Sequence, residues 1–223
     1  MGEEYIVDFQ ELQSRYSQLY TAVVGDILDQ LGYWHQILPG EIQALARGTK
    51  IFGEAFTVEG QRALDNSEND NSVRVEMLEQ VPGNSIVVMA AQADQGAAHW
   101  GEITALAARN NGCLGAVVDG GTRDVEQLLA HSFPTFARFR SPAASTGRWS
   151  VKHWQVPVQV GLVTVNPADY ILGDLDGIIV IPRNLAARVL GLAEEKVAKE
   201  KGMRAALAQG TGIGEVFRKF GHF

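Results

Sequence analysis

Residues 115–124 read Gly-Ala-Val-Val-Asp-Gly-Gly-Thr-Arg-Asp and carry the strongest structural signal in the chain. The first five residues form a short apolar run that ends in a carboxylate, which is typical of a buried strand. The Gly120-Gly121 pair then allows the chain to turn sharply off the strand end and brings backbone N–H groups close to a ligand. A helix is expected over residues 123–130, and its N-terminal amides favour an anion at this turn.

The last two residues of this stretch supply the chemistry of a binding site. Arg123 offers a fork of donors that matches a carboxylate, and Asp124 offers a hard oxygen ligand of the kind that Mg²⁺ prefers. Gly101 and Glu102 open another expected helix after a strand. In open α/β sheets, ligands bind in the crevice where two such strand-to-helix turns meet. An alternative stays open, in which the Arg-Asp pair is only a helix cap with a surface ion pair.

Outward from this stretch, predicted strands and helices follow one another along the chain. The first fifty residues are expected to be helical, with Asp8 and Thr21 as the caps of two helices. Strands are expected over residues 54–59, 85–90, 115–119, 135–139, 156–160, 162–165 and 177–181. Further helices are expected over residues 73–80, 102–110, 123–130 and 184–208, with residues 215–223 as a tail. This order predicts a single α/β domain over residues 1–223, with N-terminal helices and a long C-terminal helix.

The composition excludes several classes of protein. The 223 residues carry a net charge of −7, which argues against nucleic acid as the main partner, because phosphate binding needs clustered Lys and Arg. The longest apolar runs, such as residues 86–91, are too short to span a bilayer, and the acidic N-terminus has no apolar signal core. Cys113 is the single cysteine, so a cytoplasmic location is expected and a packing role is favoured over a nucleophilic one.

Glu102 is followed by residues 103–122 and then by Arg123-Asp124. This spacing of an acidic residue, twenty intervening residues and Arg-Asp resembles the mark of the class II, divalent-metal-dependent 4-hydroxy-4-methyl-2-oxoglutarate aldolases and the related RNase E activity regulator-like (RraA-like) proteins. Three further blocks resemble the same family in the same order along the chain. They are residues 21–32, 53–58 and 174–182.

The resemblance implies a swivelling β/β/α-type domain that assembles as homotrimers or hexamers. It implies a divalent cation, Mg²⁺ or Mn²⁺, bound by Asp124 partly through water. It also implies a lyase that cleaves 4-hydroxy-4-methyl-2-oxoglutarate-like substrates to pyruvate by a retro-aldol reaction, or decarboxylates oxaloacetate, through a metal-stabilised pyruvate enolate. Arg123 is expected to be catalytic and to contact the substrate, together with a short run that is partly recognised through backbone amides. This run consists of Gly101, Glu102, Ile103 and Thr104.

Glu102 is given a second, catalytic role. We expect it to position or deprotonate a metal-bound water that serves as the base. The resemblance also places the chain on the enzymatic side of the family, because the regulators lack this first acidic residue.

Several residues depart from the family pattern or leave alternatives open. His99-Trp100 is bulkier than the small residues expected before the Gly-acidic pair, so Trp100 is expected either to reshape the pocket or to anchor an interface. One basic group offers candidates for binding a distal carboxylate of the substrate, with Arg148 as the best one, although a solvated surface is the favoured role for most of the group: Arg138, Arg140, Arg148 and Lys152. One acidic group could reach a neighbouring subunit's site, although a solvated helix face explains it more simply: Glu194, Glu195 and Glu200.

Two alternative functions remain at this stage. The first is a non-catalytic oligomeric regulator of the ribonuclease E type, in which the Arg-Asp turn has lost its chemistry. The second is a related metal-dependent lyase or dehydratase that acts on a sugar acid.

Overall fold

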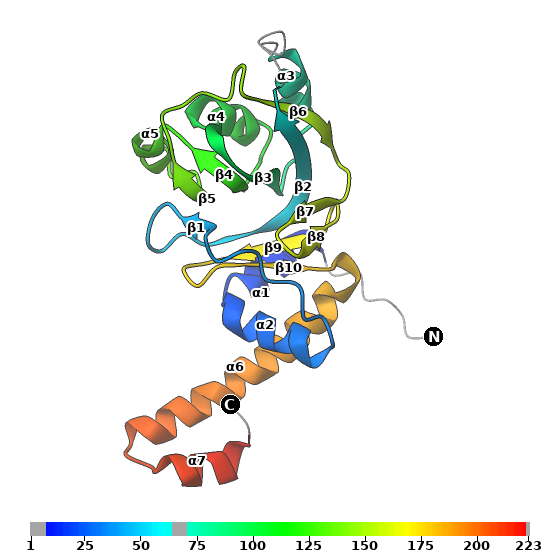
Figure 1. Cartoon of the computed structure of the whole chain (residues 1–223). Coiled ribbons are helices and arrows are strands. Elements are labelled where there is room, and N and C mark those ends of the chain that lie inside the picture. Colours follow the sequence, from blue (N-terminus) through cyan, green and yellow to red (C-terminus); the bar gives the residue numbers. More distant parts are fainter. Residues whose placement is uncertain (1–7, 64–70, 222–223) are drawn as a thin grey trace.

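A mixed β-sheet forms the centre of the protein, as seen in a computed structural model that describes residues 8–63 and 71–221. Four parallel strands that follow one another in sequence make up its core (Figure 1). These are β2 (Ile51–Arg62), β3 (Ser85–Trp100), β4 (Gly115–Thr122) and β5 (Thr135–Arg140). The sheet is completed by β1 (Gln43–Ala44), β6 (Trp149–Trp154), β9 (Tyr170–Gly173) and β10 (Ile178–Ile181). The expected α/β class is confirmed.

Strand β2 bends the sheet into a half-barrel. Its first residues pair with β9 and its last residues pair with β6, in both cases antiparallel, while its middle pairs with β3. Side chains from alternate positions of β3 enter two different cores, since Val87 and Met89 face one side and Ile86 and Val88 face the other. A hairpin of β7 (Val158–Val160) and β8 (Val163–Val165) covers the second side.

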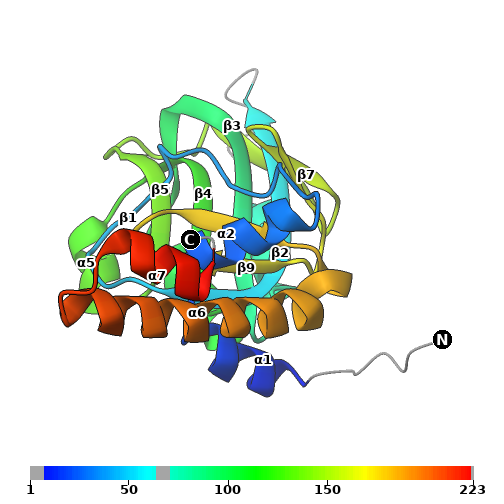
Figure 2. The ribbon, with the colours of Figure 1, turned by 90° about the horizontal axis from the view of Figure 1, so that it is seen from below.

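Two groups of helices cover the sheet. Helices α3 (Ser72–Glu79), α4 (Glu102–Asn110) and α5 (Val125–Ala130) pack on the parallel strands, because their apolar side chains share a core with β3 and β4. Helices α1 (Phe9–Tyr16), α2 (Thr21–Gln30) and α6 (Ala186–Ala208) pack on β9 and β10. Figures 1 and 2 show α6 extending beyond the body of the protein, with α7 (Ile213–Phe220) folded back along it.

The second helical group is held together by buried contacts of Tyr16 and by a partly exposed ion pair. The Tyr16 hydroxyl donates a hydrogen bond of 2.8 Å to the backbone oxygen of Ala186, at the start of α6. The Tyr16 ring stacks on Phe52 with ring centroids 4.5 Å apart. Arg15 forms an ion pair with Glu194 of α6 at 2.6 Å.

Within residues 8–63 and 71–221, no helix has the length and apolar character needed to cross a membrane.

Most predicted elements are confirmed, and three corrections are needed. Residues 31–50 are mostly irregular, because they cross the sheet edge as a connection that contains only the short β1. The tail expected after residue 214 includes α7, whose Val216 is buried. Strands β6 and β9 are not expected from the sequence, although β6 has six residues, as many as the expected β5. The helical expectation for the first fifty residues also covers residues 1–7, which lie outside the described residues.

Candidate active site

The carboxyl ends of β3 and β4 lie side by side, as the sequence predicts. Trp100 pairs with Thr122 at the ends of these parallel strands. The backbone N–H of Arg123 donates to the Trp100 carbonyl at 3.0 Å. Because each strand leads directly into a helix, the starts of α4 and α5 meet at one crevice.

Gly101 allows the two turns to pack directly against each other. A Cβ atom at this position would lie 2.7 Å from Asp124 Oδ2 and 3.0 Å from Arg123 Cγ. The backbone of Gly101 is extended, with a φ of −164°, which any residue adopts. The glycine is therefore required by the space that Arg123 and Asp124 occupy.

Asp124 is held in an unusual backbone conformation that aims its carboxylate across the crevice. Its φ of 56° and ψ of 41° are left-handed, and it is the residue before α5, which begins at Val125 rather than at 123. Its Oδ2 atom accepts hydrogen bonds from the Glu102 backbone N–H at 3.2 Å and from Arg123 Nε at 3.3 Å. Oδ1 receives no hydrogen bond from the described part of the chain, so it can accept a ligand.

A cavity of about 280 Å³ opens beside this pair. It is lined by residues of α3, of the two turns and of the segment 144–146. The structure brings five of the six predicted site residues to its wall: Gly101, Ile103, Thr104, Arg123 and Asp124. The sixth, Glu102, does not line the cavity, because its Oε1 atom lies 2.9 Å from His131 Nε2 at the end of α5.

The two glycines before Arg123 serve a different purpose from the one expected. Both belong to β4 and are buried. A Cβ at Gly120 would lie 2.4 Å from His99 Nδ1, so Gly120 leaves room for that ring. The Gly121 N–H donates to His99 Nδ1 at 3.1 Å and not to a ligand.

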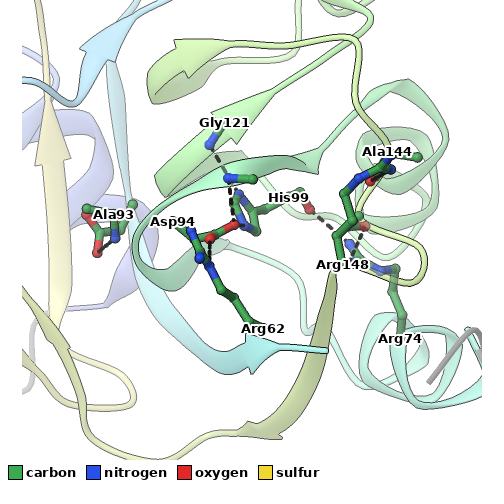
Figure 3. Close-up of polar contacts among 11 residues, drawn as sticks. Arg62, Arg74, Ala93, Asp94, His99, Gly121, Ala144 and Arg148 are labelled. Atoms are coloured by element: carbon green, nitrogen blue, oxygen red, sulfur yellow. Dashed lines mark hydrogen bonds and ion pairs between the residues drawn. The ribbon is translucent and has the colours of Figure 1, made fainter. Parts of the chain in front are cut away.

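His99 is the centre of a buried polar chain under the site (Figure 3). Since Nδ1 accepts from Gly121, the ring proton is on Nε2, which donates to Asp94 Oδ2 at 3.2 Å. Asp94 in turn forms an ion pair with Arg62. Burial lowers the pKa of His99, and the nearby Asp94 carboxylate offsets only part of this effect. His99 is therefore a neutral structural residue that holds the end of β4 in place.

Arg74 of α3 is a cavity residue that sequence analysis missed. The pattern predicts α3 but gives no signal for which of its polar residues faces the strand ends. The Arg74 guanidinium donates to the His99 backbone oxygen at 2.9 Å and to Ser145 Oγ at 3.0 Å.

The other residues considered from sequence lie away from the cavity, apart from Trp100. Trp100 lines the cavity but is only 1% exposed and stacks on Phe133, so the alternative of an interface anchor is wrong. Arg148 donates to the Ala144 carbonyl at 2.9 Å and lies outside the cavity. The remaining basic candidates also lie outside it: Arg138, Arg140 and Lys152.

The acidic residues of α6 are engaged within their own chain. Glu194 pairs with Arg15, and Glu200 accepts hydrogen bonds from Tyr20 and Arg204. Glu195 is exposed. Cys113 is buried and free, and burial raises the pKa of its thiol, as expected for a packing residue.

The donor set at the crevice fits a hard divalent cation held by few protein ligands. Among the described residues, no group of three or more His, Cys, Asp or Glu side chains could hold a metal. Asp124 offers its Oδ1 atom, and Mg²⁺ commonly takes one or two carboxylates while keeping water and substrate oxygens. A closed structural zinc site does not fit these residues.

Comparisons with known proteins agree with this geometry. Residues 21–180 match the family model described as RraA-like, Aldolase/RraA. A putative 4-hydroxy-4-methyl-2-oxoglutarate aldolase from Halalkalibacterium halodurans is 31% identical over 196 residues, which is 87% of this chain and 88% of that protein. Protein DlpA from Legionella pneumophila is 28% identical over 86% of this chain, but the match spans only 31% of that longer protein.

The fold is also found in solved structures. An uncharacterized protein from Pseudomonas syringae pv. tomato superposes with a TM-score of 0.86 and 30% identity, over 99% of each chain. The mixed sheet, the N-terminal helices and the long C-terminal helix are therefore shared by relatives. The match of the family model over most of the chain shows that this protein belongs to the RraA-like family of aldolases and RraA proteins.

Proposed function

We propose that this protein is a divalent-metal-dependent lyase that releases pyruvate from small 2-oxo acids. The substrates would be 4-hydroxy-4-methyl-2-oxoglutarate-like compounds, by retro-aldol cleavage, or oxaloacetate, by decarboxylation. The proposal is carried by the turn at Arg123-Asp124, which lies at the wall of a small cavity. There Asp124 Oδ1 accepts no hydrogen bond from the described residues and lies beside the Arg123 guanidinium. The putative aldolase among its relatives supports the same chemistry.

The residues of the turn suit the charge that develops in this reaction. Both reactions leave pyruvate as its enolate, with negative charge on the former keto oxygen. A divalent cation, Mg²⁺ or Mn²⁺, supplies Lewis-acid stabilisation of that charge when it is bound at Asp124. Arg123, which already contacts Asp124 at 3.3 Å, would place a second positive charge beside the same oxygen with little reorganisation.

Glu102 remains our candidate for handling the proton. Its backbone N–H fixes Asp124, while its carboxylate lies against His131, outside the cavity wall. To take up a proton beside Asp124, the Glu102 carboxylate would have to leave His131 and rotate toward Asp124.

We further propose that the protein works as a homotrimer or hexamer in the cytoplasm on a small-molecule substrate. The family resemblance supports the assembly, and the single buried, free cysteine is compatible with a reducing compartment. The net charge of −7 speaks against nucleic acid as a partner. The mass of the purified protein by light scattering tests the assembly, and a monomer would refute it.

The decisive assay measures pyruvate release from oxaloacetate and from 4-hydroxy-4-methyl-2-oxoglutarate, with Mg²⁺ or Mn²⁺ and after chelation. We expect pyruvate from at least one compound, lost on chelation and restored by added metal. If metal binds but neither compound yields pyruvate, the proposal fails in favour of a lyase or dehydratase for a sugar acid. If the protein neither binds metal nor releases pyruvate, the proposal is refuted and a regulator of the RraA type is favoured instead.

A further inference from the structure

Arg74 brings a second guanidinium to the cavity that Arg123 lines. It reaches from α3 toward the end of β3, and its two hydrogen bonds fix it to the His99 carbonyl and the Ser145 hydroxyl (Figure 3). A guanidinium has five N–H groups. These two bonds use one N–H on each terminal nitrogen, so the same fork retains donors for a ligand.

Among the described residues that line the cavity, two are positively charged and one is negatively charged: Arg74, Arg123 and Asp124. Arg123 is paired with Asp124, whereas Arg74 forms no ion pair with a carboxylate within residues 8–63 and 71–221. Burial lowers the pKa of Arg74, and the neighbouring charge of Arg123 lowers it further. Burial and repulsion from Arg123 both raise the free energy of the charged Arg74 side chain. An anion bound between the two arginines would lower it.

The surroundings of Arg74 favour an elongated anion over a compact one. Val75 and Leu78 of α3 also line the cavity and provide an apolar wall beside the guanidinium. An acid with charged groups at both ends and a short carbon chain between them matches this order of polar and apolar surfaces.

We propose that Arg74 binds the distal carboxylate of a dicarboxylic 2-oxo acid, while Arg123 and Asp124 engage its 2-oxo acid end. This inference rests on the proposed function and names the feature of the substrate that the site selects. It assigns to Arg74 the role for which the sequence had suggested Arg148. Arg148 instead donates to the Ala144 carbonyl and lies outside the cavity.

The test compares two five-carbon ligands that differ only at the distal end. 2-Oxoglutarate has a carboxylate there, and 2-oxopentanoate has a methyl group. Their affinities are measured by calorimetry in the presence of Mg²⁺, for the wild type and for Arg74→Met, Arg74→Lys and Arg148→Met. We expect the wild type to prefer 2-oxoglutarate by about 10- to 100-fold, the range typical of a charged hydrogen bond.

The variants test whether Arg74, and not another nearby cation, sets the preference for a distal carboxylate. Arg74→Met should abolish the preference while leaving the affinity for 2-oxopentanoate within about threefold, because the 2-oxo acid end is still bound. Arg74→Lys should keep part of the preference, since it keeps the charge but not the fork. Arg148→Met removes a nearby positive charge outside the cavity and should retain the full preference.

Three outcomes would overturn the proposal. The first is a wild type that binds 2-oxoglutarate and 2-oxopentanoate with equal affinity. The second is an Arg74→Met variant whose affinity falls equally for both ligands. The third is an Arg148→Met variant that loses the preference for 2-oxoglutarate. Neither ligand can be cleaved, because 2-oxoglutarate has no 4-hydroxyl group and no carboxylate β to its ketone. A preference without pyruvate release would therefore refute the lyase alone, and pyruvate release without a preference would refute the role of Arg74 alone.

Discussion

Single residues at the crevice have roles that the local geometry defines. Arg123 and Asp124 could be predicted because they follow a buried strand, and because the ends of adjacent parallel strands meet at one edge. The close packing of Gly101 against Arg123 and Asp124 shows that the ends of these two strands do meet. Arg74 could not be predicted, since it approaches the same point from a helix that is distant in sequence. The purpose of Gly120 also escaped prediction, because it depends on the His99 ring packed against it.

Replacing Gly101 by Ala should impair catalysis with little loss of stability. The added methyl group would displace Asp124 and Arg123, and displacements of this size in a site cost about 10- to 100-fold in turnover. Pyruvate release and the melting temperature measure the two effects. Gly40→Ala is the matched control, because its Cβ would meet nothing within 4 Å. Full activity of Gly101→Ala would contradict the packing described for this turn.

Replacing Glu102 by Gln should lower turnover far more than metal affinity. Gln keeps the backbone N–H that holds Asp124 but cannot accept a proton. We expect kcat to fall by about 100-fold or more, a typical effect of losing a general base, with metal affinity changed by less than about threefold. Glu126→Gln, at an exposed position in α5, serves as the control. An equal loss of turnover and metal affinity would assign Glu102 to metal binding instead.

The buried His99 should make the protein less stable at acidic pH. Its pKa is lowered in the folded state, so the unfolded chain binds more protons as the pH falls below about 6.5, the usual value for histidine. The free energy of unfolding therefore decreases from pH 6.5 downwards, to the lowered pKa of the folded state.

The His99→Gln variant isolates this effect. It should cost about 1–3 kcal/mol at pH 7.5, because it disturbs the hydrogen bonds to Gly121 and Asp94. The difference from the wild type, measured by denaturant unfolding, should become smaller between pH 7.5 and pH 5. A difference that stays constant or grows on acidification would show that His99 is not neutral in the fold.

At the level of helices and strands, length and flanking residues explain what could be predicted. Helix α4 is predicted at its observed bounds, since an apolar face at helical spacing ends at Asn111-Gly112. Strand β3 continues ten residues beyond the predicted end at Ala90. This second half mixes small residues with polar ones, so it lacks an apolar run, and pairing with β4 holds it in the sheet. Helix α7 was missed because the glycines between 210 and 214 suggested that regular structure ends there.

The packing of α1 on α6 gives a prediction at this scale. The Tyr16 hydroxyl is buried and bonded to the Ala186 carbonyl, and burial raises the pKa of this hydroxyl. Tyr16→Phe should lower the free energy of unfolding by about 0.5–1.5 kcal/mol and leave pyruvate release unchanged. Denaturant unfolding measures the loss, with the more exposed Tyr33→Phe as control. No measurable loss of stability in Tyr16→Phe would mean that this contact does not hold the two helices together.

At the level of the whole molecule, the sheet divides the protein into two functional parts. The end of β3, helices α3 and α4, the turn at Arg123-Asp124 and the segment 144–146 line the cavity. Helices α1, α2 and α6 pack on β9 and β10 away from it (Figure 1). The family resemblance predicted this fold correctly, since four sequence blocks in order specify the arrangement of the strands. It could not give the contacts of α6, because these depend on side chains from distant segments such as Arg15 and Tyr20.

The proposed lyase activity depends on the Asp124 carboxylate as the ligand of the divalent cation. The decisive measurement is the Mg²⁺ dependence of pyruvate release in the wild type and in Asp124→Asn. Asn tolerates the left-handed backbone at this position and keeps the size of the side chain. The substitution therefore removes the charge and replaces one carboxylate oxygen by an amide NH2 group. Asp176→Asn, at an exposed position, is the control. The account predicts that Asp124→Asn folds normally but loses at least about 100-fold in metal-dependent pyruvate release. Wild-type activity in Asp124→Asn at the same Mg²⁺ concentration would contradict it.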